Sequence, residues 1–91
     1  MDVHNLKIWP EYYRKVANGK KTFEIRRNDR DFKTGDILVL KEWHPKKEEY
    51  TGRFMEVRVT YSDDELPGLL DGFIALGIEV ILKRNVHENH R

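Results

Sequence analysis

The sequence predicts a small, mainly β domain with one or two short helices, an α+β chain that closes into a small barrel. Three observations support this fold class. The 91 residues are enough for one domain with a small core. Short runs of apolar or alternating residues recur along the chain between turn-forming residues. Only one early segment has clear helical spacing, and a short chain with many strands hides its strand edges by closing.

The first strand and the helix are expected within residues 4–17. Residues 4–9 alternate between apolar and polar positions, which predicts a strand. Pro10 suits the first turn of a helix, where its missing N–H costs nothing. Tyr12, Tyr13 and two small apolar residues one turn later form one stripe, so we expect both tyrosines in the core.

The second strand is expected at residues 22–27. Phe23 and Ile25 point to one face of this strand, and we expect them in the core. Glu24 and Arg26 point to the other face, with Cα atoms roughly 6.5 Å apart. One small polar ligand could therefore contact both charged side chains.

The rest of the chain predicts further strands separated by polar connections. Residues 37–43 begin with four apolar residues and predict a buried strand whose leucines belong to the core. Residues 53–61 alternate and predict another strand. Residues 73–83 predict one bent strand or two short ones around a bulge at Gly77. The expected connections are residues 28–36, 44–52 and 62–72, the last with one helical turn.

Composition limits the function classes. A single domain is expected over residues 1–84, with a flexible tail at 85–91. The net charge of +1 argues against coating of duplex DNA. There is no cysteine, and His87 and His90 are too few for a zinc site, so no metal and no cofactor are expected. No apolar run approaches a membrane span of about 20 residues, and no signal peptide is evident, so a cytoplasmic location is expected.

Positive charge is concentrated near the second strand. Residues 20–33 contain six basic and three acidic side chains, a net charge of +3, while the rest of the chain nets −2. Within this stretch the string GKKTFEIR resembles the G-x-K-x-x-E-x-R signature of the ASCH domain. The residues in register are Gly19, Lys21, Glu24 and Arg26.

Other strings extend this resemblance over nearly the whole chain. GDIL at residues 35–38 matches a turn of the family, and YTGR, VTY and GFIALG within residues 50–77 resemble a small bacterial and phage branch of uncharacterised function. The resemblance implies a PUA-like β-barrel with a cleft beside the signature strand. It also implies that RNA or a nucleotide binds in that cleft.

Four residues are candidate ligand contacts. An arginine such as Arg26 can grip phosphate or a base edge, and a carboxylate such as Glu24 can accept from exocyclic amines or sugar hydroxyls. Lys21 could reach the same mouth, and Trp43 could stack on a base, which is worth about 1–3 kcal/mol. From the residues alone, Glu24 and Arg26 could instead form a cross-strand ion pair that closes the barrel, worth roughly 0–1 kcal/mol.

Two other functions stay open. Some small ASCH proteins are amidohydrolases that deacylate a modified cytidine such as N4-acetylcytidine, and their motif resembles G-x-K-T-x-T. Lys21 and Thr22 match that motif, but Glu24 replaces its second threonine. In a hydrolase, Lys21 would act as the base toward water or Thr22, and Glu24 would relay the proton. Arg26 could stabilise the oxyanion, and Glu65 is the candidate for the downstream carboxylate of the motif. The third candidate is a protein-interaction module, and the sequence indicates no oligomeric state.

Overall fold

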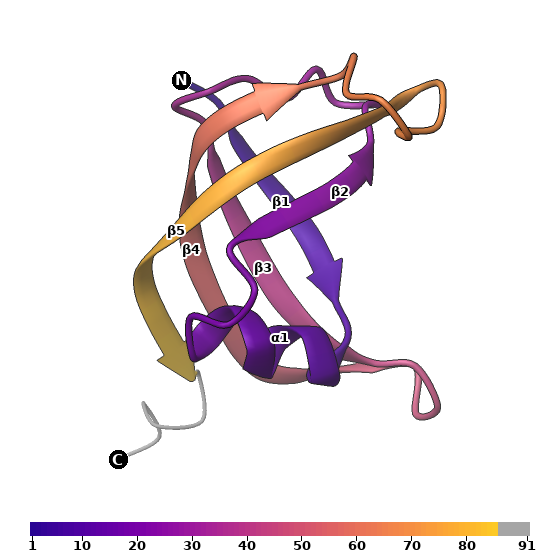
Figure 1. Ribbon diagram of the computed structural model, residues 1–91. Helices are drawn as coiled ribbons and strands as arrows, with labels where there is room; N and C mark the ends of the chain where they lie inside the picture. The colour runs from indigo at the N-terminus through magenta and orange to yellow at the C-terminus, as the bar shows by residue number, and fades with distance from the viewer. Residues whose placement is uncertain (86–91) are drawn as a thin grey trace.

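The computed structural model describes residues 1–85 and shows one curled sheet with a single helix in that part of the chain (Figure 1). The mainly β fold class is therefore confirmed. The elements in chain order are β1 (Val3–Ile8), α1 (Pro10–Ala17), β2 (Phe23–Arg27), β3 (Ile37–His44), β4 (Glu49–Asp63) and β5 (Phe73–Asn85).

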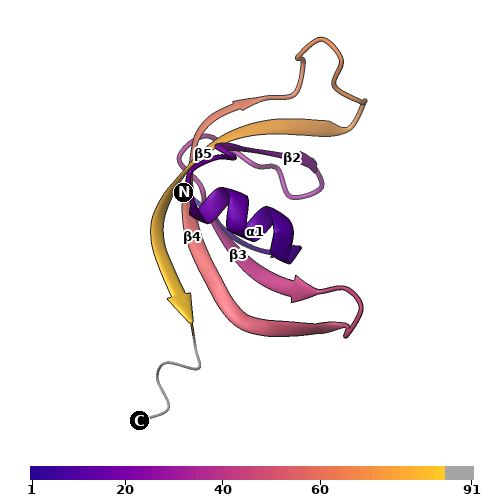
Figure 2. The ribbon, with the colours of Figure 1, turned by 60° about the horizontal axis from the view of Figure 1, so that its bottom comes forward.

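The five strands form one sheet in the order β1-β3-β4-β5-β2. β1 and β3 are parallel, and every other neighbouring pair is antiparallel. The sheet curls into a half-barrel, and α1 lies inside the curl (Figure 2). The expected barrel is thus present as a half-barrel whose edge strands, β1 and β2, flank its opening.

The core follows the alternation of the strands. Successive side chains point to opposite faces, so alternate residues of β1, of most of β3, of the middle of β4 and of the first half of β5 are buried inside the curl. α1 adds its own apolar stripe through Tyr13 and Val16. The most deeply buried strand residues are Leu38, Leu40, Met55, Val57, Val59 and Leu76.

β4 and β5 are long strands that bend through bulges. Val59 pairs with Ile78 and Tyr61 with Gly77, so Thr60 is an extra residue on β4. A Cβ atom at Gly77 would lie 2.9 Å from Thr60 Oγ1, so a larger residue there would have to displace the Thr60 side chain. The expected bulge near Gly77 is present, although its extra residue belongs to β4, and β5 is one continuous strand.

Three predicted core residues are exposed. Phe23 and Ile25 are 48% and 53% exposed, and Glu24 between them is the buried residue of β2. The alternation of β2 was predicted correctly, but its faces were assigned the wrong way round. The reason is that the inner face of β2 borders the opening of the half-barrel, where charged partners are available to a buried carboxylate. Tyr12 was also expected in the core and is 41% exposed, because only Tyr13 faces the sheet.

The connections also differ from expectation. β3 continues to His44 and β4 begins at Glu49, so most of the predicted connection at 44–52 is strand. Residues 64–72 contain turns and bends but no helical turn. His87 and His90 lie outside the described residues. Within residues 1–85, no helix has the length and apolar character needed to cross a membrane.

Candidate functional site

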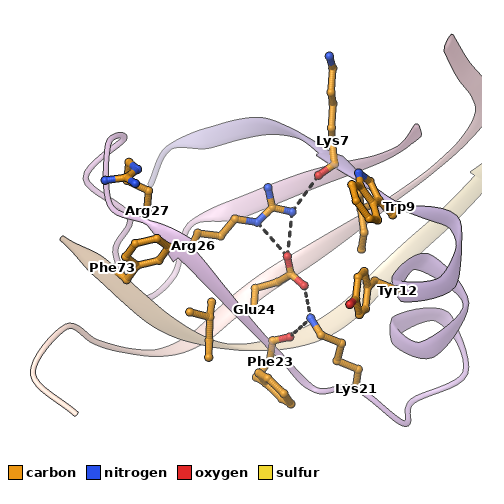
Figure 3. Close-up of a pocket in the computed structure, with 11 residues that line it drawn as sticks. Lys7, Trp9, Tyr12, Lys21, Phe23, Glu24, Arg26, Arg27 and Phe73 are labelled. Atoms are coloured by element: carbon orange, nitrogen blue, oxygen red, sulfur yellow. Dashed lines mark hydrogen bonds and ion pairs between the residues drawn. The ribbon is translucent and has the colours of Figure 1, made fainter. Parts of the chain in front are cut away.

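A pocket of about 480 Å³ lies at the opening of the half-barrel, beside the edge strand β2 (Figure 3). The walls come from the end of β1, from α1, from β2 and from the start of β5. Its lining residues are Lys7, Ile8, Trp9, Tyr12, Lys21, Phe23, Glu24, Ile25, Arg26, Arg27 and Phe73.

Glu24 is the central charged group of this pocket. Its side chain is almost fully buried, and the whole residue is 4% exposed. Arg26 Nε donates to Glu24 Oε1 at 2.9 Å, and Arg26 Nη2 lies 2.8 Å from the same oxygen in an ion pair. Lys21 Nζ pairs with Glu24 Oε2 and also donates to the Phe23 carbonyl oxygen at 2.8 Å. A buried carboxylate requires such partners, and the two cations leave this triad with a net positive charge.

Arg26 also connects the two edges of the half-barrel. Its Nη2 donates to the Lys7 carbonyl oxygen of β1 at 3.0 Å, and Arg30 Nη1 donates to the neighbouring Asn5 carbonyl oxygen at 2.6 Å. The ion pair of Glu24 lies within β2 and its approach, not across strands. The link across the opening is made by arginine side chains bonded to the main chain of β1.

Aromatic side chains supply the apolar walls of the pocket. Trp9 is 51% exposed, and the Tyr12 ring faces Lys21, whose Nζ lies 5.7 Å from its centroid. On the opposite side, the Arg27 guanidinium lies 5.0 Å from the centroid of Phe73 (Figure 3). Sequence reasoning assigned Tyr12 to the core and gave no role to Arg27 or Phe73. Trp9 was placed in the first strand at residues 4–9, whereas that strand ends at Ile8 and Trp9 directly follows it.

The structure brings together three of the predicted site residues, Lys21, Glu24 and Arg26, and separates the others from them. Trp43 lies on β3 outside the pocket lining, with Lys7 Nζ 3.8 Å from its ring centroid. Thr22 is exposed and does not line the pocket; its carbonyl oxygen accepts from the main chain of β5. Glu65 lies in the loop between β4 and β5, also outside the lining.

A second buried carboxylate, Glu42, has a different setting. It is 2% exposed, and Arg53 holds it in a bidentate pair at 2.8 and 2.7 Å, with Thr51 Oγ1 donating at 2.6 Å. The Arg53 hydrogen bonds outweigh the effect of burial and hold the pKa of Glu42 below its usual value. Burial raises the pKa of neighbouring Tyr13, whose ring lies under the Arg53 guanidinium. This cluster joins β3 to β4, and both oxygens of its Glu42 carboxylate already accept hydrogen bonds.

A third polar cluster sits where β1 begins. Asp2, His4 and Asp36 place potential metal-ligand atoms within 4.8 Å of one another. Asp36 already accepts from the main chain of Asp2 and Lys33 and contacts His4 Nε2 at 2.9 Å. Burial alone would raise the pKa of Asp36, but these hydrogen bonds outweigh it and keep that pKa below its usual value. The cluster therefore ties β1 to the turn before β3.

Comparison with known proteins identifies relatives of the chain. Residues 3–78 match the family model described as "Domain of unknown function (DUF3850)". The chain is 36% identical over 74 residues to the "Uncharacterized 12.9 kDa protein in GpA 3'region" of Escherichia phage P2, an alignment that covers 81% of this chain and 65% of the phage protein. The fold is similar to the crystal structure of hypothetical protein PH0355, with a TM-score of 0.59, 20% identity, and coverage of 87% of this chain and 99% of that one.

Proposed function

We propose that this chain, which belongs to the DUF3850 family, binds RNA or a nucleotide in the pocket at the opening of the half-barrel. The observation that supports this proposal most is the combination of lining groups. A buried carboxylate held by two cations lies between exposed aromatic rings and a further arginine. Nucleotides offer the matching groups, which are a flat ring, hydroxyl and amine donors, and a phosphate.

The ion pairs indicate which groups are available to a phosphate. Lys21 and two nitrogens of Arg26 are already bonded to Glu24. Arg27 is exposed. Within residues 1–85, its guanidinium contacts the Phe73 ring and forms no ion pair or hydrogen bond. We therefore assign phosphate binding chiefly to Arg27 and to the remaining Nη1 of Arg26. The Trp9 and Tyr12 rings are the surfaces on which a base would stack.

The resemblance to ASCH domains supports the same proposal. Its signature residues Lys21, Glu24 and Arg26 are the three that meet in the pocket. A PUA-like classification of the half-barrel and a cytoplasmic location belong to this proposal as well. Trp43 takes no part in the primary site, because it is separated from the pocket lining.

Hydrolysis is the alternative that the geometry favours less. The Lys21 ammonium donates to both Glu24 and the Phe23 carbonyl oxygen, whereas a general base needs a free lone pair. Thr22 does not line the pocket, so no hydroxyl of the predicted catalytic set stands beside it. Incubation with N4-acetylcytidine checks this alternative, and release of cytidine would establish it.

Binding is best tested by titrating the protein with nucleoside monophosphates and short single-stranded RNA while following tryptophan fluorescence. Arg27→Ala should weaken binding about 10-fold, which corresponds to the loss of one charged hydrogen bond. Arg58→Ala is the matched control, because Arg58 is also an exposed strand arginine but pairs with Glu79 away from the pocket. No binding at low salt, or equal losses in both variants, would contradict the proposed function.

A further inference from the structure

The main chain of β2 faces the pocket along one edge. Ile78 N donates to the Thr22 carbonyl oxygen, and Asn28 N donates to the Gly72 carbonyl oxygen. The main-chain polar groups of even-numbered residues on this segment therefore point toward β5. Antiparallel pairing alternates these directions, so the odd-numbered residues of β2 direct their N–H and C=O groups toward the opening.

Two carbonyl oxygens of the opposite edge of the opening already have partners. On β1 the carbonyl oxygens of Asn5 and Lys7 face the opening, and they accept from Arg30 and Arg26. On β2 the Phe23 carbonyl oxygen accepts from Lys21 Nζ. On β2, within residues 1–85, the residues whose outward N–H and C=O are both without a contact to another strand or a charged side chain are Ile25 and Arg27, which also line the pocket.

We propose that a nucleobase of the ligand docks its Watson–Crick edge on the main-chain N–H and C=O of Ile25. This inference rests on the proposed function and specifies how the base is held. Every nucleobase presents a hydrogen-bond donor beside an acceptor on that edge, which complements the N–H and C=O of one extended residue. Main-chain groups that line a pocket need such partners once water is displaced.

The length of the edge favours a base over a peptide strand. β2 has only five residues, and Lys21 already blocks the Phe23 carbonyl oxygen at its start. One or two residues can therefore pair, which matches a single base better than an added β-strand. Because Watson–Crick pairing would occupy the same base edge, the site should accept unpaired bases and reject duplexes. It should also distinguish little among the four bases.

A first test uses the unmodified protein and needs no variant. The four ribonucleoside 5′-monophosphates are titrated beside ribose 5-phosphate, and the tightest-binding nucleotide is then compared with its Watson–Crick methylated derivative, 3-methyl for a pyrimidine or 1-methyl for a purine. The methyl group removes or blocks the donor–acceptor pair, so binding should weaken by about 10-fold or more. Equal binding of the methylated and unmodified nucleotides overturns the inference.

A second test removes the main-chain donor itself. Ile25→Pro deletes the Ile25 N–H, and proline is tolerated on edge strands where the N–H faces away from the sheet. The variant should lose about 10-fold in nucleotide affinity. An amide NMR spectrum of the parent protein gives a direct readout, since the Ile25 N–H signal should shift on nucleotide addition. An unshifted Ile25 signal at saturation overturns the inference even if the proline variant fails to fold.

The outcomes separate this inference from the proposed function. If neither the monophosphates nor short single-stranded RNA binds, the proposed function fails and the docking mode fails with it. If they bind but tolerate the methyl group, only the docking mode fails. If an extended pentapeptide of valines and threonines shifts the amide signals of Phe23–Arg27 and no nucleotide does, β2 is a peptide-docking edge and both proposals are overturned.

Discussion

Replacing Arg26 with alanine should lower the free energy of unfolding by about 2 kcal/mol. Arg26 forms an ion pair and one hydrogen bond with Glu24, which is 4% exposed, and donates once to the Lys7 carbonyl oxygen. Breaking a fully buried ion pair costs about 3–5 kcal/mol because it leaves an uncompensated charge. Here Lys21 still neutralises the carboxylate, and the Arg26 side chain is 23% exposed, so the loss should be smaller than that range.

Arg30→Ala is the matched control for this prediction. Arg30 also crosses the opening to β1, but it makes a single hydrogen bond, to the Asn5 carbonyl oxygen, and contacts no buried carboxylate in the described part of the chain. Its loss should cost about 0.5 kcal/mol, in the range of an exposed interaction. The fourfold difference isolates the contribution of the buried carboxylate from that of closing the half-barrel.

Urea denaturation at pH 7, followed by tryptophan fluorescence, measures both variants. The shift of the midpoint multiplied by the urea dependence gives the change in free energy. For a domain of this size, the Arg26→Ala change should lower the melting temperature by about 10 °C. The double variant Glu24→Gln/Arg26→Ala completes a thermodynamic cycle and should show a coupling energy above about 0.5 kcal/mol. If Arg26→Ala and Arg30→Ala destabilise the protein equally, the buried carboxylate does not depend on Arg26 and this argument is wrong.

Three further predictions concern stacking, pH and the bulge. Trp9→Ala should weaken nucleotide binding about 10-fold, and Trp43→Ala should leave it unchanged. Calorimetry measures both affinities without relying on tryptophan fluorescence. A loss of affinity in Trp43→Ala but not in Trp9→Ala would place the ligand on the outer face of the sheet. The folded-state pKa of Glu42 lies below the unfolded value of about 4.3, so its stabilising contribution is present above that pH and is lost as the pH falls through the folded-state pKa. Glu42→Gln should therefore be less stable than the parent at pH 7, with a difference that shrinks in urea titrations below about pH 4. Gly77→Ala should destabilise by about 1 kcal/mol through the 2.9 Å approach to Thr60 Oγ1, and adding Thr60→Ala should restore most of the loss; no recovery would mean that the strain lies in the main chain.

The sequence was informative about the elements because their signals are local. Alternation located the strands, Pro10 located the start of α1, and Gly77 indicated a bulge. The face that β2 buries could not be read in the same way. Apolar Phe23 and Ile25 alternate with charged residues, and apolar residues are the ordinary choice for a core. Which face is buried depends on the rest of the half-barrel, including β1, which is distant in sequence and whose Lys7 carbonyl oxygen accepts from Arg26.

The site shows the same division between local and distant information. Lys21, Glu24 and Arg26 share one short segment, so their meeting could be predicted from spacing. Trp9 and Tyr12 join them because β1 leads into α1 beside the opening, which depends on the strand order β1-β3-β4-β5-β2. Trp43 was expected near the site because it ends a strand that was taken to neighbour β2, but that strand pairs with β1 and β4.

The geometry of the opening links binding to stability. A half-barrel with two edge strands must satisfy or protect their main-chain groups, and arginine side chains do this for β1. β2 does not pair with β1, and its edge and its buried carboxylate lie beside the pocket. A ligand that binds there adds contacts across the opening, and only the folded chain offers both of its sides. Bound nucleotide should therefore raise the melting temperature of the parent protein, and it should raise that of Arg26→Ala less, because that variant has lost one side of the site.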